Sequence, residues 1–132
     1  QLYFNQTEPI GIIYLEGKKY FIGSNKKIIS SDNINISNRL PVAFGKFKIV
    51  EYMKFVEILK KHNIQLNEIQ NIFYHKSKRW DFELISGEYI MLPSKNLLSS
   101  IKVYNSFKKN NISKKIKSID LRVANQISII YE

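Results

Sequence analysis

Hydrophobic and polar residues alternate in short runs along much of this chain, which is typical of strands that bury one face. In the first thirty residues such runs are separated by the turn-forming stretches EGKK and GSNKK, and this predicts several short strands. The clearest alternation lies at residues 80–84. The apolar set, expected in the core, is Trp80, Phe82 and Leu84. Asp81 and Glu83 alternate with it and are expected to face solvent.

The spacing of apolar residues changes from two to three and four in two places, and this predicts two amphipathic helices. The first covers residues 46–62 and ends in Lys-Lys-His, a cluster that suits the C-terminus of a helix. The second lies within residues 93–110 and is expected to be capped near Ser94. Between the predicted elements, residues 30–39 are rich in Ser and Asn and are expected to form a loop, and LPVAFG is expected to be a tight connection.

The pattern predicts two further hairpins. SGEYIML places Gly87 in a turn, and SIDLRVANQISIIYE, residues 118–132, alternates on both sides of Ala-Asn-Gln. The last strand of the sequence therefore has nothing after it to pair with, and its outer edge is expected to be open. Short strands with two intervening helices predict a single α+β domain over residues 1–132, with a mainly antiparallel sheet and both helices packed on one face.

The composition is that of a folded, strongly basic domain. The chain has 132 residues, 44% of them hydrophobic, and a net charge of +10. The charge has two interpretations: a nucleic-acid or anionic-membrane partner, or lysines spread over solvated faces. There is no cysteine, which excludes disulfides and thiolate chemistry. Because the sequence begins with Gln1 rather than Met, it is expected to be part of a longer chain.

The residue types needed for catalysis are not arranged for it. His62 and His75 lie on different predicted elements, without a neighbouring ligand set, so no metal site is expected. Ser99 and Ser100 lie in a predicted helix with no base nearby. No phosphate-binding glycine motif occurs. The sequence therefore predicts neither an enzyme nor a cofactor.

One basic segment keeps a second class of function open. HKSKRW, residues 75–80, combines cations with an aromatic residue, which is a pattern that binds single-stranded nucleic acid. However, Trp80 also begins the alternating strand, and that places it in the core. A basic nucleic-acid-binding module stays as the alternative, and a purely structural domain is a third possibility.

The second half of the chain resembles a known family. RWDFELISGEYIMLP, a helix, and then IDLRVANQISI are similar to the C-terminal β domain of the bacterial cell-division family FtsQ/DivIB. The matching landmarks are Trp80, Gly87, Leu92-Pro93 and Asp120-Leu121-Arg122, in that order. The stretches EPIGIIYLEGKKYFI and LPVAFGKF resemble the family's first strands and the connection before its first helix.

The resemblance implies that this domain is a non-enzymatic scaffold and lies in the periplasm. It also implies that the full-length protein is anchored in the inner membrane by one helix, and that this helix and a POTRA domain lie outside the given sequence. It implies that FtsB- and FtsL-type proteins bind this domain, with a strand added to the sheet at its C-terminal edge. The partner-binding residues that it implies are Arg122, Val123, Asn125, Ile130 and Tyr131, with Lys78 and Arg79 as a second basic region.

Overall fold

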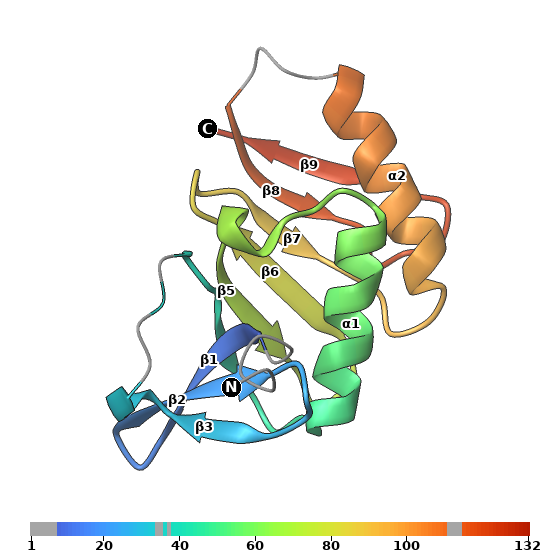
Figure 1. Cartoon of the computed structure of the whole chain (residues 1–132). Helices are drawn as coiled ribbons and strands as arrows, with labels where there is room; N and C mark the ends of the chain where they lie inside the picture. The colour runs from blue at the N-terminus through green and yellow to red at the C-terminus, as the bar shows by residue number, and fades with distance from the viewer. Residues whose placement is uncertain (1–7, 34–35, 37, 111–114) are drawn as a thin grey trace.

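The computed structural model describes residues 8–33, 36, 38–110 and 115–132, and within these it contains two α-helices and one nine-stranded sheet. Figure 1 shows their arrangement. The strands are β1 (Pro9–Leu15), β2 (Lys18–Gly23), β3 (Ile28–Ser30), β4 (Val42–Phe44), β5 (Ile69–Tyr74), β6 (Trp80–Leu84), β7 (Tyr89–Met91), β8 (Ile116–Asp120) and β9 (Ser128–Tyr131). The helices are α1 (Ile49–Lys61) and α2 (Leu97–Asn110), with single 3₁₀ turns at Ser31–Asn33 and Leu66–Glu68.

The sheet is mixed, not mainly antiparallel as the sequence predicted. Its strand order is β3-β2-β1-β4-β5-β6-β7-β8-β9. Hairpins make five of the eight neighbouring pairs antiparallel, but β1 with β4, β4 with β5, and β7 with β8 run parallel. The α+β class is confirmed, and only the direction of the pairing differs.

The parallel pairs come from crossovers that hydrophobic spacing does not reveal. α1 connects β4 to β5 and α2 connects β7 to β8, and a helix that returns the chain to its starting end makes the next strand parallel. The stretch LPVAFG, expected to be only a tight connection, contains β4. With three residues, β4 is too short to show an alternating pattern.

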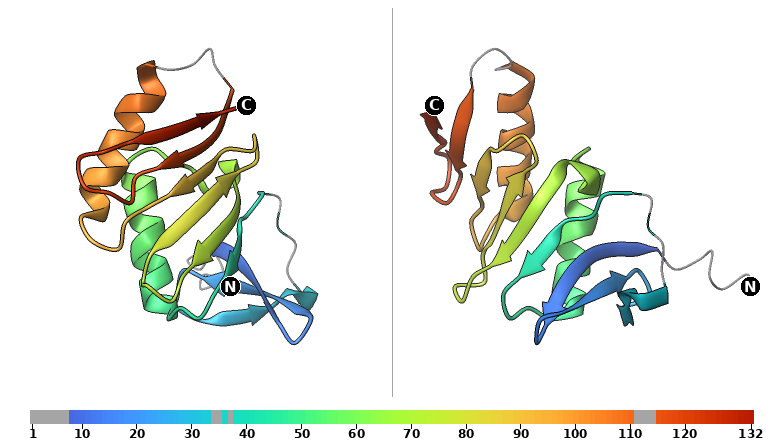
Figure 2. Two further views of the ribbon diagram at one scale, coloured as in Figure 1. Left: turned by 180° about the vertical axis from the view of Figure 1, so that it is seen from behind. Right: turned by 90° about the vertical axis from the view of Figure 1, so that its left-hand side faces the viewer.

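Both helices lie on the same face of the sheet (Figure 2). The buried residues of α1 are Tyr52, Phe55, Val56 and Leu59. Their spacing of three and four puts them on one side of the helix, against the sheet. Phe55 stacks on Trp80 with ring centroids 4.8 Å apart. Trp80 is therefore a core residue, as its alternation with Phe82 predicted.

Close contact between α1 and β1 requires a glycine. The Tyr52 hydroxyl donates a 2.8 Å hydrogen bond to the Ile10 carbonyl, so the ring lies directly over the next residue, Gly11. A Cβ at this position would overlap the phenol. Gly11 therefore sets how closely the helix packs on this strand.

The start of α2 also differs from the prediction. The helix begins at Leu97, and its first helical hydrogen bond runs from the Ser100 N–H to the Asn96 carbonyl. Asn96, rather than Ser94, therefore precedes the first turn. The Asn105 amide donates to the His62 carbonyl over 2.7 Å and ties the middle of α2 to the end of α1. Neither helix has the length and hydropathy needed to cross a membrane.

Candidate functional site

The sheet ends at β9, and no strand pairs with the outer edge of β9 within the described part of the chain. β9 pairs antiparallel with β8, with Ile130 opposite Ser118 and Tyr131 opposite Ile116. Ile130 is 57% exposed and Tyr131 is 44% exposed, so both present apolar surface to solvent. β9 is thus the last strand of the described sheet, and it carries apolar side chains and no charged ones.

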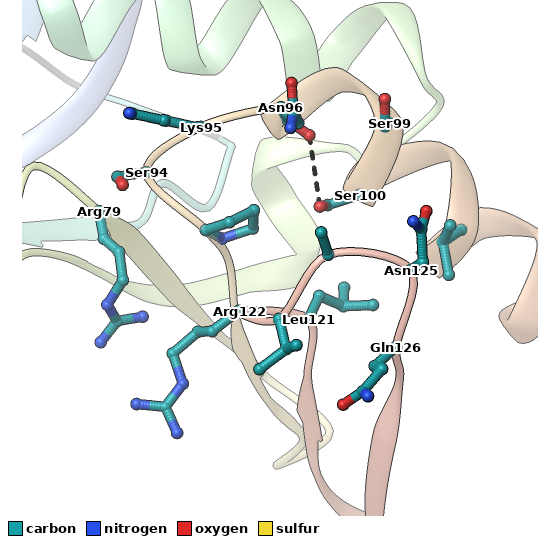
Figure 3. Close-up of a pocket in the computed structure, with 14 residues that line it drawn as sticks. Arg79, Ser94, Lys95, Asn96, Ser99, Ser100, Leu121, Arg122, Asn125 and Gln126 are labelled. Atoms are coloured by element: carbon teal, nitrogen blue, oxygen red, sulfur yellow. Dashed lines mark hydrogen bonds between the residues drawn. The ribbon is translucent and has the colours of Figure 1, made fainter.

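A cavity of about 510 Å³ lies at the turn end of the β8–β9 hairpin. The segment before α2, the first turns of α2 and the β8–β9 connection form its walls (Figure 3). Four of the seven residues implied by the resemblance line it: Arg79, Arg122, Val123 and Asn125. Lys78, Ile130 and Tyr131 lie elsewhere, the last two along β9.

Arg122 lies at the rim of this cavity and is bonded to the carboxylate of Asp120, two residues earlier in the chain. Its Nε and Nη2 donate to the two oxygens of Asp120 over 2.9 and 2.7 Å, and its backbone N–H donates to Asp120 over 3.0 Å. These bonds lower the pKa of the Asp120 carboxyl and raise that of the guanidinium. The bonds to Asp120 fix the orientation of the Arg122 side chain. Because this side chain is still 47% exposed, its other N–H groups face solvent.

Arg79, by contrast, is bound inside the protein. Its Nη1 donates to Asp81 over 2.5 Å and to the Leu92 carbonyl over 3.2 Å, and its side chain is 17% exposed. Figure 3 shows the Arg79 and Arg122 side chains extending in the same direction. Both contribute positive charge to one side of the cavity, but Arg122 is the cation with the freer donors.

Asp81 corrects the sequence prediction that it faces solvent. The strand directs it away from the helices, but Arg79, His75 and Tyr89 enclose it, and the residue is 2% exposed. The Tyr89 hydroxyl donates to Asp81 Oδ2 over 2.9 Å, and His75 Nε2 lies 2.7 Å from the same oxygen. The burial of Tyr89 and its bond to the Asp81 carboxylate raise the pKa of this phenol. Asp81 is therefore a buried acidic side chain with three polar partners.

The basic turn between β5 and β6 lacks an exposed aromatic residue. Trp80 is packed under α1, and Tyr74 lies against it at a ring distance of 4.5 Å. His75 and Arg79 are both bonded to Asp81. Lys78 is exposed and has a positive φ, where its N–H closes the turn onto the His75 carbonyl. The turn thus presents lysine charge without a surface for stacking bases.

The catalytic residue types stay apart in the fold. His62 caps the end of α1, with Nδ1 2.9 Å from the Ile58 carbonyl oxygen, whereas His75 belongs to the Asp81 cluster. Among the described residues, no group of three His, Cys, Asp or Glu side chains could hold a metal. The Ser100 hydroxyl donates to the Asn96 carbonyl over 3.3 Å (Figure 3), so it is used within the helix.

Sequence reasoning missed Asp81 and Asp120 as the residues that hold the two arginines. Each acid lies two positions from its arginine, which is a spacing that brings side chains to one face of an extended segment. That spacing was a usable signal for Asp120, which lies in the same Asp-Leu-Arg motif. The sequence also did not indicate that the segment before α2 forms a wall of the cavity.

The fold and this edge define a class of domain: an α+β unit with a mixed sheet, a helix layer on one face, and β9 as the last strand of the described sheet. The chain belongs to the family described as "Cell division protein FtsQ/DivIB, C-terminal", whose model matches residues 12–122. Family membership places it among the bacterial cell-division proteins.

The chain is similar to known cell-division proteins, among them an FtsQ and a DivIB. The cell division protein FtsQ of Rickettsia bellii (strain RML369-C) is 28% identical over 126 residues, which are 94% of this chain and 47% of the relative. The chain therefore spans about half the length of this curated relative. The major extracytoplasmic domain of the cell division protein DivIB from Geobacillus stearothermophilus has the same fold, with a TM-score of 0.53 and 13% identity over 80% of this chain and 97% of that one.

Proposed function

We propose that this domain is a non-enzymatic scaffold of the division machinery that binds FtsB- or FtsL-type proteins by adding their strand to the outer edge of β9. The observation that carries the proposal is the open edge itself, with Ile130 and Tyr131 exposed along it. In strand addition the main chain supplies hydrogen bonds, and alternate side chains supply specificity.

The opposite edge of the sheet supports the choice of β9. β3 has three residues, follows a turn that contains Lys26 and Lys27, and leads directly into a 3₁₀ turn. Short length and nearby lysines are the usual protections of an edge strand. β9, Ser-Ile-Ile-Tyr, is one residue longer, and neither strand contains a charged residue. The lysines before β3 and the 3₁₀ turn after it therefore favour β9 as the receiving edge.

The cavity adds positively charged residues at one end of the proposed interface. A strand along β9 that continues past Ser128 reaches the β8–β9 connection, where Arg122, Val123 and Asn125 lie. The free N–H groups of Arg122 suit a partner carboxylate, and Val123 adds apolar contact. Arg79 and Lys78 contribute positive potential rather than direct bonds, since Arg79 is bound to Asp81 and Lys78 lies in the turn.

The location follows from the same proposal. We place the domain on the periplasmic side of the inner membrane, attached to a single membrane helix outside the given sequence. The relative from Geobacillus stearothermophilus is titled an extracytoplasmic domain, which supports this side of the membrane.

The test uses a synthetic peptide from the C-terminal region of the same organism's FtsB-type protein. Two versions carry N-methyl groups on alternate residues, in opposite registers. Strand addition requires every second amide of the peptide, so one version loses binding and the other retains it. Backbone amide shifts of the domain report both titrations and should concentrate on residues 118–132.

Two domain variants locate the edge. Ile130→Asp should weaken peptide binding at least tenfold, since it places a charge in the apolar contact, whereas Ile28→Asp on β3 should leave binding unchanged. Equal effects of both variants, or retained binding with both methylated peptides, would refute strand addition at β9. Shifts confined to residues 75–80, with salt-sensitive oligonucleotide binding, would instead favour the nucleic-acid module.

A further inference from the structure

The strands and the helices of this protein differ in net formal charge. The nine strands carry three lysines and three acidic residues, so their formal charges cancel. The two helices carry six lysines and two glutamates. The lysines of the helices are Lys54, Lys60, Lys61, Lys102, Lys108 and Lys109. The helices therefore have a formal charge of +4, and the remaining +6 of the chain's +10 lies in the connecting and terminal segments.

On α1, the most outward line of side chains combines cations with an exposed aliphatic residue. Val50, Lys54, Glu57 and Lys61 follow each other at intervals of four, three and four, opposite the buried face of the helix. Val50 is 45% exposed.

α2 repeats the arrangement. Leu98, Lys102 and Lys109 are exposed at intervals of four and seven, and Leu98 is 47% exposed. The two helices lie side by side over the same face of the sheet (Figures 1 and 2), and the Asn105–His62 hydrogen bond joins them. We call Val50, Lys54, Lys61, Leu98, Lys102 and Lys109 the helix-layer surface.

These lysines are not consumed by internal ion pairs. In the part of the chain that the structure describes, the ion pairs of the helix residues reduce to Lys108 with Glu68, at 3.8 Å. The four lysines of the helix-layer surface therefore face solvent with their charges uncompensated, apart from the single Glu57 between the two on α1.

We propose that the helix-layer surface binds the headgroups of an anionic phospholipid bilayer. Lysines attract the lipid charge, and their aliphatic stems lie along apolar groups while the ammonium ions stay in water. Val50 and Leu98 supply apolar contacts at the boundary between headgroups and acyl chains, as exposed side chains of surface-bound helices do.

The same surface is poorly suited to the other polyanions. It has no exposed aromatic side chain on which bases could stack, which separates it from single-strand binding surfaces. Exposed aliphatic residues gain nothing from a phosphate backbone. Bilayer contact through this layer would leave the open face of the sheet and the β9 edge directed away from the lipid, free for a protein partner.

The experiment measures binding of the domain to vesicles of phosphatidylcholine containing about one third phosphatidylglycerol, with pure phosphatidylcholine vesicles alongside. The test variant changes Lys54, Lys61, Lys102 and Lys109 to Gln. Its matched control changes Lys26, Lys27, Lys46 and Lys76 to Gln, which removes the same charge from exposed turns of the sheet layer.

We expect binding to the anionic vesicles, with a loss of about fivefold per lysine and therefore on the order of several hundredfold for the four changes of the test variant. The matched control should lose much less. A second variant, Val50→Ser with Leu98→Ser, should weaken vesicle binding and leave any oligonucleotide binding unchanged. Circular dichroism and the FtsB-type peptide titration verify that each variant is folded, so that failure here is separable from failure of the proposed scaffold function.

Three outcomes would overturn the proposal. The first is no binding of the unaltered domain to anionic vesicles. The second is an equal loss in the test and control variants, which would show only an effect of net charge. The third is oligonucleotide binding that depends on the same four lysines while vesicle binding does not.

Discussion

This domain contains the ion pairs Asp81–Arg79 and Asp120–Arg122, which have the same chemistry but differ in burial and in the number of further partners. In both, the partners are two residues apart and bond through more than one guanidinium nitrogen. Asp81 is 2% exposed and has two further partners, His75 and Tyr89. The Asp120–Arg122 pair lies at the surface. Burial, rather than residue type, decides which pair is structural and which is available to a partner.

The two ion pairs should contribute differently to the free energy of unfolding. Removing one partner of a buried ion pair leaves a charge without compensation and costs about 3–5 kcal/mol, whereas an exposed pair contributes about 0.2–1 kcal/mol. The two pairs should therefore respond very differently to the same substitution.

The largest effect is expected for Asp81→Asn, which leaves the Arg79 guanidinium unpaired in a largely buried position. The free energy of unfolding should fall by about 3–5 kcal/mol, measured by urea denaturation. Asp120→Asn is the matched control and should cost less than about 1 kcal/mol. Equal losses would show that burial does not distinguish the pairs.

Tyr89→Phe tests how much the Tyr89 hydroxyl contributes to the cluster around Asp81. It removes the 2.9 Å hydrogen bond to Asp81 but keeps the ring, which packs beside Phe73. A bond to a charged acceptor contributes about 1.5–3 kcal/mol, so the loss of stability should approach that range and stay below that of Asp81→Asn. Thermal unfolding of the two variants in parallel gives the ranking, and an unchanged melting temperature would contradict it.

Arg122→Glu should separate stability from binding. Because the Asp120–Arg122 pair is exposed, the stability should change by no more than about 1 kcal/mol. Binding of the FtsB-type peptide should weaken at least tenfold, as measured by calorimetry, because the variant places two acids at the cavity rim. Unfolding seen by circular dichroism would instead make Arg122 a structural residue.

The smallest effect concerns pH. The pKa of Asp120 is lowered in the folded state, so the unfolded state binds a proton first as pH falls. Its contribution is fully present above the ordinary value of 3.8 and is lost as pH falls through the lower, folded-state pKa. The small stability difference between the unaltered domain and Asp120→Asn should therefore vanish in acid. A difference that persists there would show that the ion pair is not its source.

The sequence predicted those parts of the fold that depend on local spacing. The alternation around Trp80, the spacing in α1 and the terminal hairpin each specify a buried face without reference to distant residues. Parallel pairing depends on where a crossover returns the chain, and a three-residue strand such as β4 has no readable period.

The candidate site was predictable only in part for the same reason. The Asp-Leu-Arg motif carries both members of the exposed pair, so Arg122 could be selected from the sequence. Asp81 faces the side of the sheet that the alternation predicted. Its burial depends on Tyr89, which comes from the next strand, and on the conformation of the turn that holds His75 and Arg79.

The order of strands in the sheet also constrains how the domain folds. Among the described strands, every neighbouring pair except β1–β4 joins strands that are consecutive along the chain. The hairpin pairs close short loops at low entropic cost, whereas the β4–β5 and β7–β8 pairs must wait for a helix-containing crossover. β9 contacts the sheet only through its hairpin with β8. An intermediate in which this hairpin has not formed therefore cannot offer the edge proposed to receive the partner.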